Sequence, residues 1–192
     1  TTSKNGRRCS SAVGYLKPVW HRKNLSIETN AMVMKVLFDG TRASGVIYRQ
    51  HGQDKTVHVN NEIILAGGAV NSPQLLQLSG IGPAAHLHAL GINIVSDSPG
   101  VGADLQDHYQ ARLVTELNKP LSVNDDVKNF VRKAWTGLKY ILFRRGPMTF
   151  SAGHIGVFTR VLPESASPDA QVHFIPFSAT KIGGDLHPFS GV

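Results

Sequence analysis

The chain has 192 residues, which is room for one large domain or two small ones. Its 41% of apolar residues exclude a wholly disordered chain, a collagen and a coiled coil. A single cysteine, Cys9, excludes an intrachain disulfide and a CxxC metal site. No apolar run approaches the ~20 residues of a membrane span, and no signal peptide precedes the first strand-like segment. We therefore expect a cytoplasmic protein with no integral membrane segment.

The formal net charge of +7 is unevenly distributed along the chain. Residues 1–55 carry +7 and residues 112–192 carry +4, whereas residues 56–111 contain four acids and no Lys or Arg, which gives −4. The middle stretch also holds most of the glycine-rich turns. Because a nucleic-acid-binding protein concentrates cations where it meets phosphates, this distribution argues against nucleic acid as a partner.

The first half of the chain has the pattern of an antiparallel meander. Residues 24–40 alternate between apolar and polar side chains and end at the turn signal Asp39-Gly40. A second strand is expected over 42–50, ending near His51-Gly52. A third is expected to contain Val57 and Val59 and to continue into the apolar run 63–65, which is typical of a strand buried on both faces.

Short helices are predicted after this run. Ser72 is a favourable N-cap and Pro73 suits the first helical position, so a helix is expected from there to Gly80. A second short helix is predicted over 83–90, followed by a strand over 92–97. A tight turn is expected over 98–102.

The last part of the chain alternates strands with one long helix. Residues 112–118 resemble a strand, and Ser122 with Asp125 forms a capping box. Apolar residues at helical spacing behind it predict a continuous helix over 122–145, with its cations on the polar side. Two late strands are predicted over 154–161 and 171–177.

Two glycine-rich segments could carry chemistry. An apolar strand that ends in glycines and feeds a helix, as at 63–78, lets a ligand approach the backbone and offers N–H groups to an anion, although such turns often serve packing alone. Gly80 to Ala85 formally matches GxGxxA, with Asp104 at the distance of a ribose ligand. The helix-like residues before Gly80 argue against a dinucleotide fold there.

Other catalytic patterns are not supported. His86 and His88 face apart on a helix, and neither HxxxH nor HExxH occurs, so no metal site is predicted. No GxSxG elbow occurs, and Cys9 has no base near it in the sequence. The basic helix 122–145 could bind an anionic partner, but it could equally be a solvated face over an apolar stripe.

Several segments together resemble one enzyme family. Residues 68–82, GAVNSPQLLQLSGIG, resemble the second signature of the glucose–methanol–choline (GMC) flavoprotein oxidoreductases, G-A-x-N-S-P-x-L-L-x-x-S-G-I-G. Residues 99–108, PGVGADLQDH, resemble the P-G-V-G-x-N-L-Q-D-H that follows it. Segments in the same chain order agree: RRCSSAVGYLKP, RKNLSIETNAMV, RASGVIYR, LSVND, GPMTF and PDAQVHFIPF. The resemblance covers nearly the whole chain and is closest to the choline and alcohol dehydrogenase branch.

This resemblance implies FAD as cofactor and oxidation of a primary alcohol to an aldehyde by hydride transfer to the flavin. Its partners would be a small-molecule alcohol and an electron acceptor that these residues do not identify. The A-x-V step Ala31-Met32-Val33 implies that the Val33 backbone lies against the adenine. The remaining implied cofactor contacts are Ala66, Gly67, Asn71, Asp107 and His108, of which Asn71 could instead serve the helix scaffold.

The implied fold is α/β, in part α+β. Residues 1–111 would form part of a Rossmann-like FAD-binding domain with an antiparallel meander. Residues 112–192 would form part of a substrate domain of antiparallel sheet and helices. The family's N-terminal GxGxxG loop and C-terminal catalytic His have no counterpart here, so we expect an internal segment with no catalytic residue and no activity alone.

One residue bears on the substrate. Choline-oxidising relatives carry a glutamate in a G-x-E-A-G-x-F stretch, which corresponds here to 153–158 with His154 in place of the acid. A neutral imidazole supplies no fixed anion for a quaternary ammonium, and its protonated form repels one. His154 is thus a candidate substrate-binding residue that disfavours choline. The alternative to the enzyme reading is a stand-alone module that binds an anionic partner through the basic helix 122–145.

Overall fold

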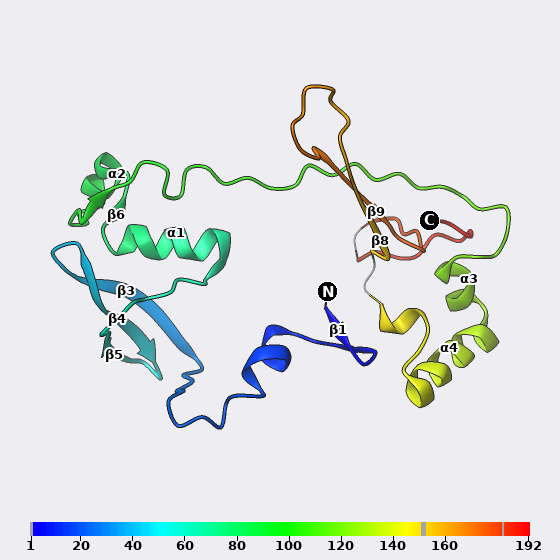
Figure 1. Cartoon of the computed structure of the whole chain (residues 1–192), viewed down its shortest axis with the longest axis horizontal. Coiled ribbons are helices and arrows are strands. Elements are labelled where there is room, and N and C mark those ends of the chain that lie inside the picture. The colour runs from blue at the N-terminus through cyan, green and yellow to red at the C-terminus, as the bar shows by residue number, and fades with distance from the viewer. Residues whose placement is uncertain (1, 151–152, 182) are drawn as a thin grey trace. The chain divides into compact units, whose positions relative to one another are not determined.

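The computed structural model describes residues 2–150, 153–181 and 183–192 (Figure 1). The chain divides into two compact units. One is Ser26–Gln110, and the other joins the residues up to Leu25 with those from Ala111 onward. The chain passes between the units at 25/26 and again at 110/111. The domain boundary predicted at 111/112 lies next to the second point, and the first point was not predicted. The mixture of helices and antiparallel strands expected from the sequence is confirmed.

The unit Ser26–Gln110 is built on a three-stranded meander. Its strands β3 (Ala31–Asp39), β4 (Arg42–Gln50) and β5 (Gln53–His58) pair antiparallel in sequence order. Gly40 has φ +57°, which suits the predicted Asp39-Gly40 turn. A register shift between Val33 and Lys35 marks a bulge in β3, which lies at an edge of the sheet.

The third predicted strand was too long. Strand β5 ends at His58, and the apolar run 63–65 is outside every strand of the described chain. Ile64 is 77% exposed. An apolar run becomes a central strand only when neighbouring strands hydrogen-bond to both of its edges, and this unit provides none there.

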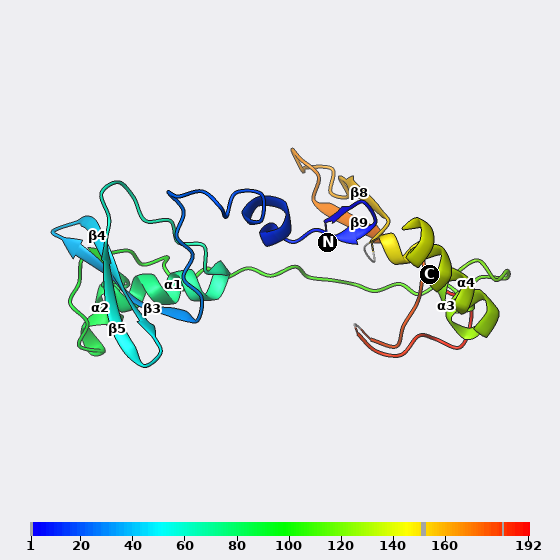
Figure 2. The ribbon, with the colours of Figure 1, turned by 90° about the horizontal axis from the view of Figure 1, so that it is seen from below.

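The first long helix begins earlier than predicted. Helix α1 spans Gly68–Leu78 with Gly67 as its N-cap residue, so Ser72 is not the cap and Pro73 lies inside the helix. The Ser72 hydroxyl instead accepts a hydrogen bond of 3.0 Å from the Gly67 N–H. The helix thus begins about one turn before the predicted cap, and its first residue, Gly68, has φ +88°. Figure 2 shows α1 beside the meander.

A small parallel pair follows α1. Strand β6 (Ile81–Gly82) pairs with β7 (Ser96–Asp97), and the predicted helix between them is confirmed as α2 (Ala84–Ala89). The predicted strand 92–97 is reduced to its last two residues. Leu87 of α2 is fully buried and anchors this end of the unit.

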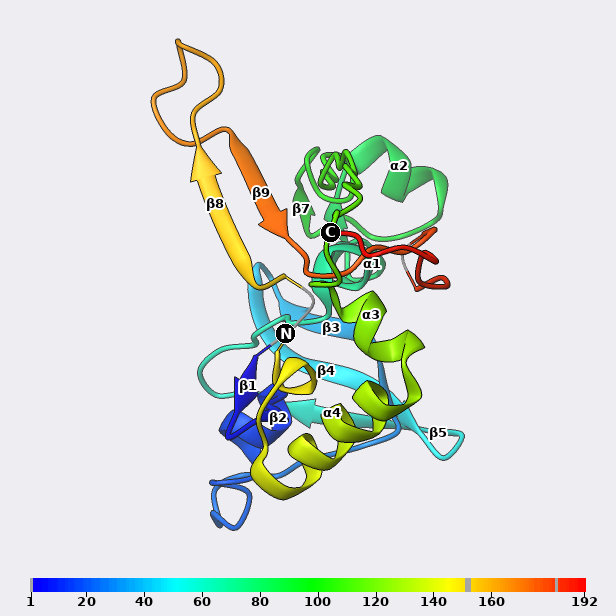
Figure 3. The same ribbon diagram turned by 90° about the vertical axis from the view of Figure 1, so that its right-hand side faces the viewer.

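The second unit combines short helices and hairpins. Its elements are β1 (Ser3–Lys4), β2 (Arg7–Arg8), a π-helical turn (Ala12–Leu16), α3 (Val123–Lys128), α4 (Phe130–Phe143), a 3₁₀ turn (Pro147–Thr149), β8 (Ile155–Thr159) and β9 (Ala170–Phe174). The two late strands were predicted, and they form an antiparallel hairpin (Figure 3). The predicted strand 112–118 is only an isolated bridge, between Glu116 and Gly191.

The predicted helix 122–145 is wrong as one element. It is broken at Asn129, whose backbone is extended (φ −86°, ψ 115°) between α3 and α4. The Asn129 Oδ1 accepts hydrogen bonds from the N–H groups of Val131 and Arg132, at 3.0 and 3.1 Å, and so caps α4. The capping box of Ser122 and Asp125 is confirmed at the start of α3.

Helix α4 also packs in the reverse of the expected orientation. Its half-buried residues are Thr136, Gly137 and Tyr140 on the polar side. The apolar stripe is exposed: Phe130, Val131, Trp135, Leu138, Ile141 and Leu142 are all 45% exposed or more. The stripe therefore does not face a core within the described chain.

Candidate functional site

The amino end of α1 is open to a ligand. Gly68 has φ +88°, and a side chain built on it would meet no atom within 4 Å. Ala66, Gly67 and Asn71 are exposed around it, and the first turn carries no acid. The N–H groups and positive dipole of a helix start favour a negatively charged or hydrogen-bond-accepting group. The nucleotide part of FAD carries such groups, so this end of α1 fits it.

Val33 lies in the same unit, on the edge strand β3. It pairs with Tyr48, is 42% exposed and precedes the bulge. The helix and strand are joined by a buried hydrogen bond, in which the Val36 N–H donates to the Ser79 Oγ at 2.9 Å. Helix α1 thus carries the predicted cofactor residues at its amino end and is hydrogen-bonded at its carboxyl end to β3, the strand of Val33.

Asp107 and His108 take no part in the hydrogen bond between β3 and α1. Both are exposed in a segment without secondary structure, over 104–115. In the described chain their only hydrogen bond runs from the His108 N–H to the Asp107 Oδ1, at 2.8 Å. The structure does not bring their side chains to the amino end of α1.

The glycines of the GxGxxA match serve packing. A Cβ on Gly80, which has φ +96°, would lie 2.4 Å from the Asn93 carbonyl oxygen, and one on Gly82 would lie 3.0 Å from the Gln77 Cγ. The residues before Gly80 are helical, and α2 has only six residues. The strand, turn and long helix of a dinucleotide site are therefore missing around this match.

His154 lies in the other unit, directly before β8. Its N–H donates to the Phe174 carbonyl at 3.0 Å, and its ring centroid lies 4.8 Å from that of Phe150. Both rings border a pocket of about 370 Å³ that Phe174 and Asp126 also line. Asp126 was not predicted, because its separation of 28 residues from His154 leaves no local pattern that links the two side chains.

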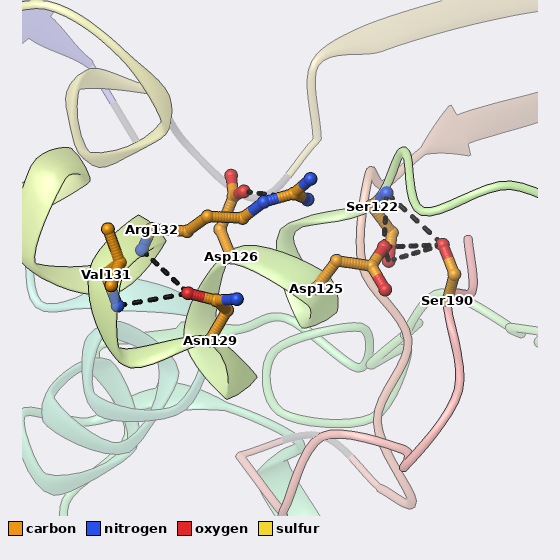
Figure 4. Close-up of polar contacts among 7 residues, drawn as sticks. All are labelled: Ser122, Asp125, Asp126, Asn129, Val131, Arg132 and Ser190. Atoms are coloured by element: carbon orange, nitrogen blue, oxygen red, sulfur yellow. Dashed lines mark hydrogen bonds and ion pairs between the residues drawn. The ribbon is translucent and has the colours of Figure 1, made fainter.

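Asp126 has a cationic neighbour. The Arg132 guanidinium lies 4.0 Å from its carboxylate, and both side chains are partly exposed, so their attraction is weak (Figure 4). A pocket with three aromatic rings and one carboxylate can receive an apolar small molecule with a polar or cationic group.

The wall of this pocket is fixed by a second carboxylate. The Ser190 hydroxyl donates to Asp125 at 2.6 Å, and the Ser122 N–H donates at 3.0 Å (Figure 4). These bonds, that of Ser190 first, lower the pKa of Asp125 below its ordinary value. Because Ser122 itself lines the pocket, the network holds that wall against the C-terminal residues.

The remaining predictions concern metals, membranes and the basic helix. Among the described residues, no group of three or more His, Cys, Asp or Glu side chains could hold a metal ion. None of the described helices is long and apolar enough to cross a membrane. Two cations of the segment 122–145, which was predicted as one helix, have partners within the chain. Arg132 lies near Asp126, and the Arg144 guanidinium lies 4.7 Å from the ring centroid of Tyr140.

Comparison with known proteins gives consistent matches. Residues 1–110 match the family described as GMC oxidoreductase. Over 186 residues the chain is 42% identical to the oxygen-dependent choline dehydrogenase of Staphylococcus haemolyticus, with 96% of this chain and 32% of that protein covered. It is 42% identical over 175 residues to the mitochondrial choline dehydrogenase of Homo sapiens, with 91% and 29% covered.

A solved structure agrees. The FAD-dependent oxidoreductase from Chaetomium thermophilum superposes with a TM-score of 0.67 at 32% identity, over 76% of this chain and 26% of that one. The chain thus spans about a third of the length of the curated relatives it matches.

Proposed function

Because the chain belongs to the GMC oxidoreductase family, whose members are FAD-dependent flavoproteins, we propose that it is part of an enzyme that oxidises a primary alcohol to an aldehyde. The observation that carries this proposal is the placement of the family match. It includes the whole unit Ser26–Gln110, and that unit presents the open amino end of α1 and the exposed edge residue Val33.

The roles of this chain's residues follow from the site. The Val33 backbone and the small residues Ala66 and Gly67 would hold the adenosine end of FAD, and the start of α1 would offer N–H groups to its polar atoms. Asn71 would add a side-chain amide. When bound, FAD accepts the hydride removed from the alcohol. Asp107 and His108 are proposed as cofactor-region residues on the strength of the family resemblance alone.

We further propose that this chain is one segment of a longer enzyme and is inactive by itself. No side chain here is assigned as the catalytic base. The relatives are about three times as long, and the exposed apolar stripe of α4 is a surface that further polypeptide would cover. Residues 1–111 would then belong to the FAD domain and residues 112–192 to the substrate domain.

The substrate is proposed to be an uncharged alcohol in preference to choline. The curated relatives are named choline dehydrogenases, but His154 stands where choline-oxidising members have an acid. Its pocket retains one carboxylate, Asp126, and the Arg132 guanidinium 4.0 Å away offsets part of its charge. A comparison of choline with an uncharged alcohol of similar size, using the flavin-loaded enzyme, tests this preference. A higher kcat/KM for choline would contradict it.

The cofactor and reaction are tested with the product of the reading frame that contains this chain. The purified protein is expected to show the visible absorption of a flavin, and an alcohol should bleach it under anaerobic conditions. Turnover would then be followed with an artificial electron acceptor. A protein that carries no flavin, even after incubation with FAD, would contradict the proposal.

We also propose that the protein is located in the cytoplasm. Cell fractionation tests this location.

The second candidate, a stand-alone module for an anionic partner, is weaker. It requires a continuous basic face over 122–145, but the chain bends at Asn129 and two of the cations are engaged within the unit. Salt-sensitive retention of the 192-residue chain on DNA or on anionic vesicles would support this module. Equal retention of the chain by neutral vesicles would contradict it.

A further inference from the structure

The last turn of α1 connects the segments that face the proposed cofactor. Ser79, 1% exposed, accepts the hydrogen bond from the Val36 N–H and donates its own hydroxyl hydrogen to the Leu75 carbonyl at 2.6 Å. Val36 follows Val33 across the bulge of β3. Ser79 therefore fixes the distance and angle between the helix and the strand that carries Val33.

Gln77 makes a second connection, to the turn after β7. Its Nε2 donates to the Val101 carbonyl at 2.8 Å. The side chain runs between two glycines, since a Cβ on Gly102 would lie 2.6 Å from Nε2 and one on Gly82 would lie 3.0 Å from Cγ. Gly82 of the segment 68–82 and Gly102 of the segment 99–108 thus make room for Gln77. The turn over 98–102 leads into the segment that contains Asp107 and His108.

We propose that Gln77 and Ser79 are positioning residues of the FAD site. Neither needs to touch the cofactor. One helix presents Gly67 and Asn71 at its amino end and holds β3 and the 98–102 turn at its carboxyl end. Loss of either connection lets a cofactor-facing segment move relative to the others while the helix itself remains. This inference rests on the proposed function.

The first test needs no cofactor and uses amide hydrogen exchange of the 192-residue chain. In Gln77→Ala, the amides of Val101 and Ala103 are expected to exchange about 2- to 10-fold faster, the range of one net hydrogen bond. In Ser79→Ala the same increase is expected from Val33 to Val36. Gln74→Ala, an exposed glutamine on the same helix, is the matched control. Faster exchange spread evenly over the unit would overturn the inference.

The second test uses the flavin-loaded enzyme that contains this chain. Gln77→Ala is expected to weaken FAD binding about 2- to 10-fold and to change the visible absorption and circular dichroism of the bound flavin. Gln74→Ala should change neither. A merely structural role would lower the melting temperature and leave the spectrum of the folded, flavin-loaded fraction unchanged, which would overturn the inference. An enzyme that binds no flavin in any variant would instead refute the proposed function, and the inference would fall with it.

Discussion

Among the described residues of its unit, Asn124 has the side chain with the most hydrogen-bond contacts. It is completely buried, and its Nδ2 lies 2.9 to 3.3 Å from the carbonyl oxygens of Ser178, His187 and Phe189 and from the Ser178 hydroxyl. Its Oδ1 accepts from the Ser178 N–H at 3.1 Å. One buried amide, which shares its two N–H hydrogens among these acceptors, thus links α3 to the backbone of the C-terminal segment.

Replacing Asn124 by Ala should therefore destabilise this unit strongly. We expect a loss of about 3 kcal/mol in the free energy of unfolding, because several buried polar groups lose their partner together. Denaturant titration measures this loss. Asn118→Ala, at an exposed position of the same unit, should change the free energy by less than about 0.5 kcal/mol. Similar effects of the two variants would contradict the role given to Asn124.

Asp169 gives the loop between β8 and β9 a dependence on pH. Its carboxylate accepts hydrogen bonds from the Ser165 hydroxyl and from the N–H groups of Val161 and Leu162, which lower the pKa of Asp169 to about 2. A carboxyl whose pKa is lowered by folding stabilises the folded loop above its ordinary pKa. That stabilisation disappears as the pH falls from about 4 toward 2.

Amide chemical shifts of Val161 and Leu162 should consequently titrate in this acidic range. Asp169→Asn should remove the transition, since the amide cannot ionise, whereas Glu164→Gln in the same loop should preserve it. If Asp169→Asn left the acid transition of these two amides in place, the assignment to Asp169 would be wrong.

At the scale of elements, the sequence predicted best where the signal was local. The meander followed from the Asp39-Gly40 turn and alternating side chains. Local patterns also predicted α2, the capping box and the two late strands, although not the pairing of β8 with β9. The strand expected over 63–65 failed because a strand depends on hydrogen-bonding neighbours, which an apolar run does not specify. The predicted cofactor residues were named from the family resemblance, and they remain predictions. Gln77 and Asp126 escaped prediction because their roles depend on contacts distant in sequence.

The break at Asn129 had a local signal that the apolar periodicity concealed. Asparagine is a strong N-cap residue and a poor residue for a helix interior. Because the apolar spacing continues across it, the pattern predicts one helix where the capping side chain imposes two.

Asn129→Ala should cost about 1 kcal/mol of unit stability, since two N–H groups at the start of α4 lose their acceptor. Asn129→Ser should restore most of this loss because its hydroxyl also accepts. Denaturation followed by circular dichroism distinguishes the variants. Equal stability of the alanine and serine variants would show that the cap contributes nothing.

At the scale of the molecule, few apolar side chains are removed from water. Among the described residues only Val36, Leu87 and Ala179 are buried apolar ones, while the stripe on α4 is exposed. Large exposed apolar surface promotes association. The purified 192-residue chain is therefore expected to bind hydrophobic dyes and to self-associate.

Ile141→Glu should reduce dye binding and self-association of the isolated chain without loss of stability, because Ile141 is 66% exposed. In the proposed longer enzyme the same change should destabilise folding by about 3 kcal/mol, since it would bury an unpaired charge. Lys139→Glu, at an exposed position beside the stripe, is the control and should have little effect in either protein. Tolerance of Ile141→Glu in the longer enzyme would contradict a covered stripe.

The hydrogen bond between Val36 and Ser79 also has a consequence for unwanted assembly. Open sheet edges present free N–H and C=O groups that can recruit a strand from another molecule. On β3, the Ser79 hydroxyl at the carboxyl end of α1 accepts the outward-facing N–H of Val36 and so satisfies one amide of this edge. The opposite edge, β5, is uncovered but carries Asp54 and Lys55, and the Arg49–Asp54 ion pair at 2.6 Å crosses to it from β4. Strand recruitment is thus opposed on one edge of the meander by the side chain of Ser79 at Val36, and on the other edge by charge.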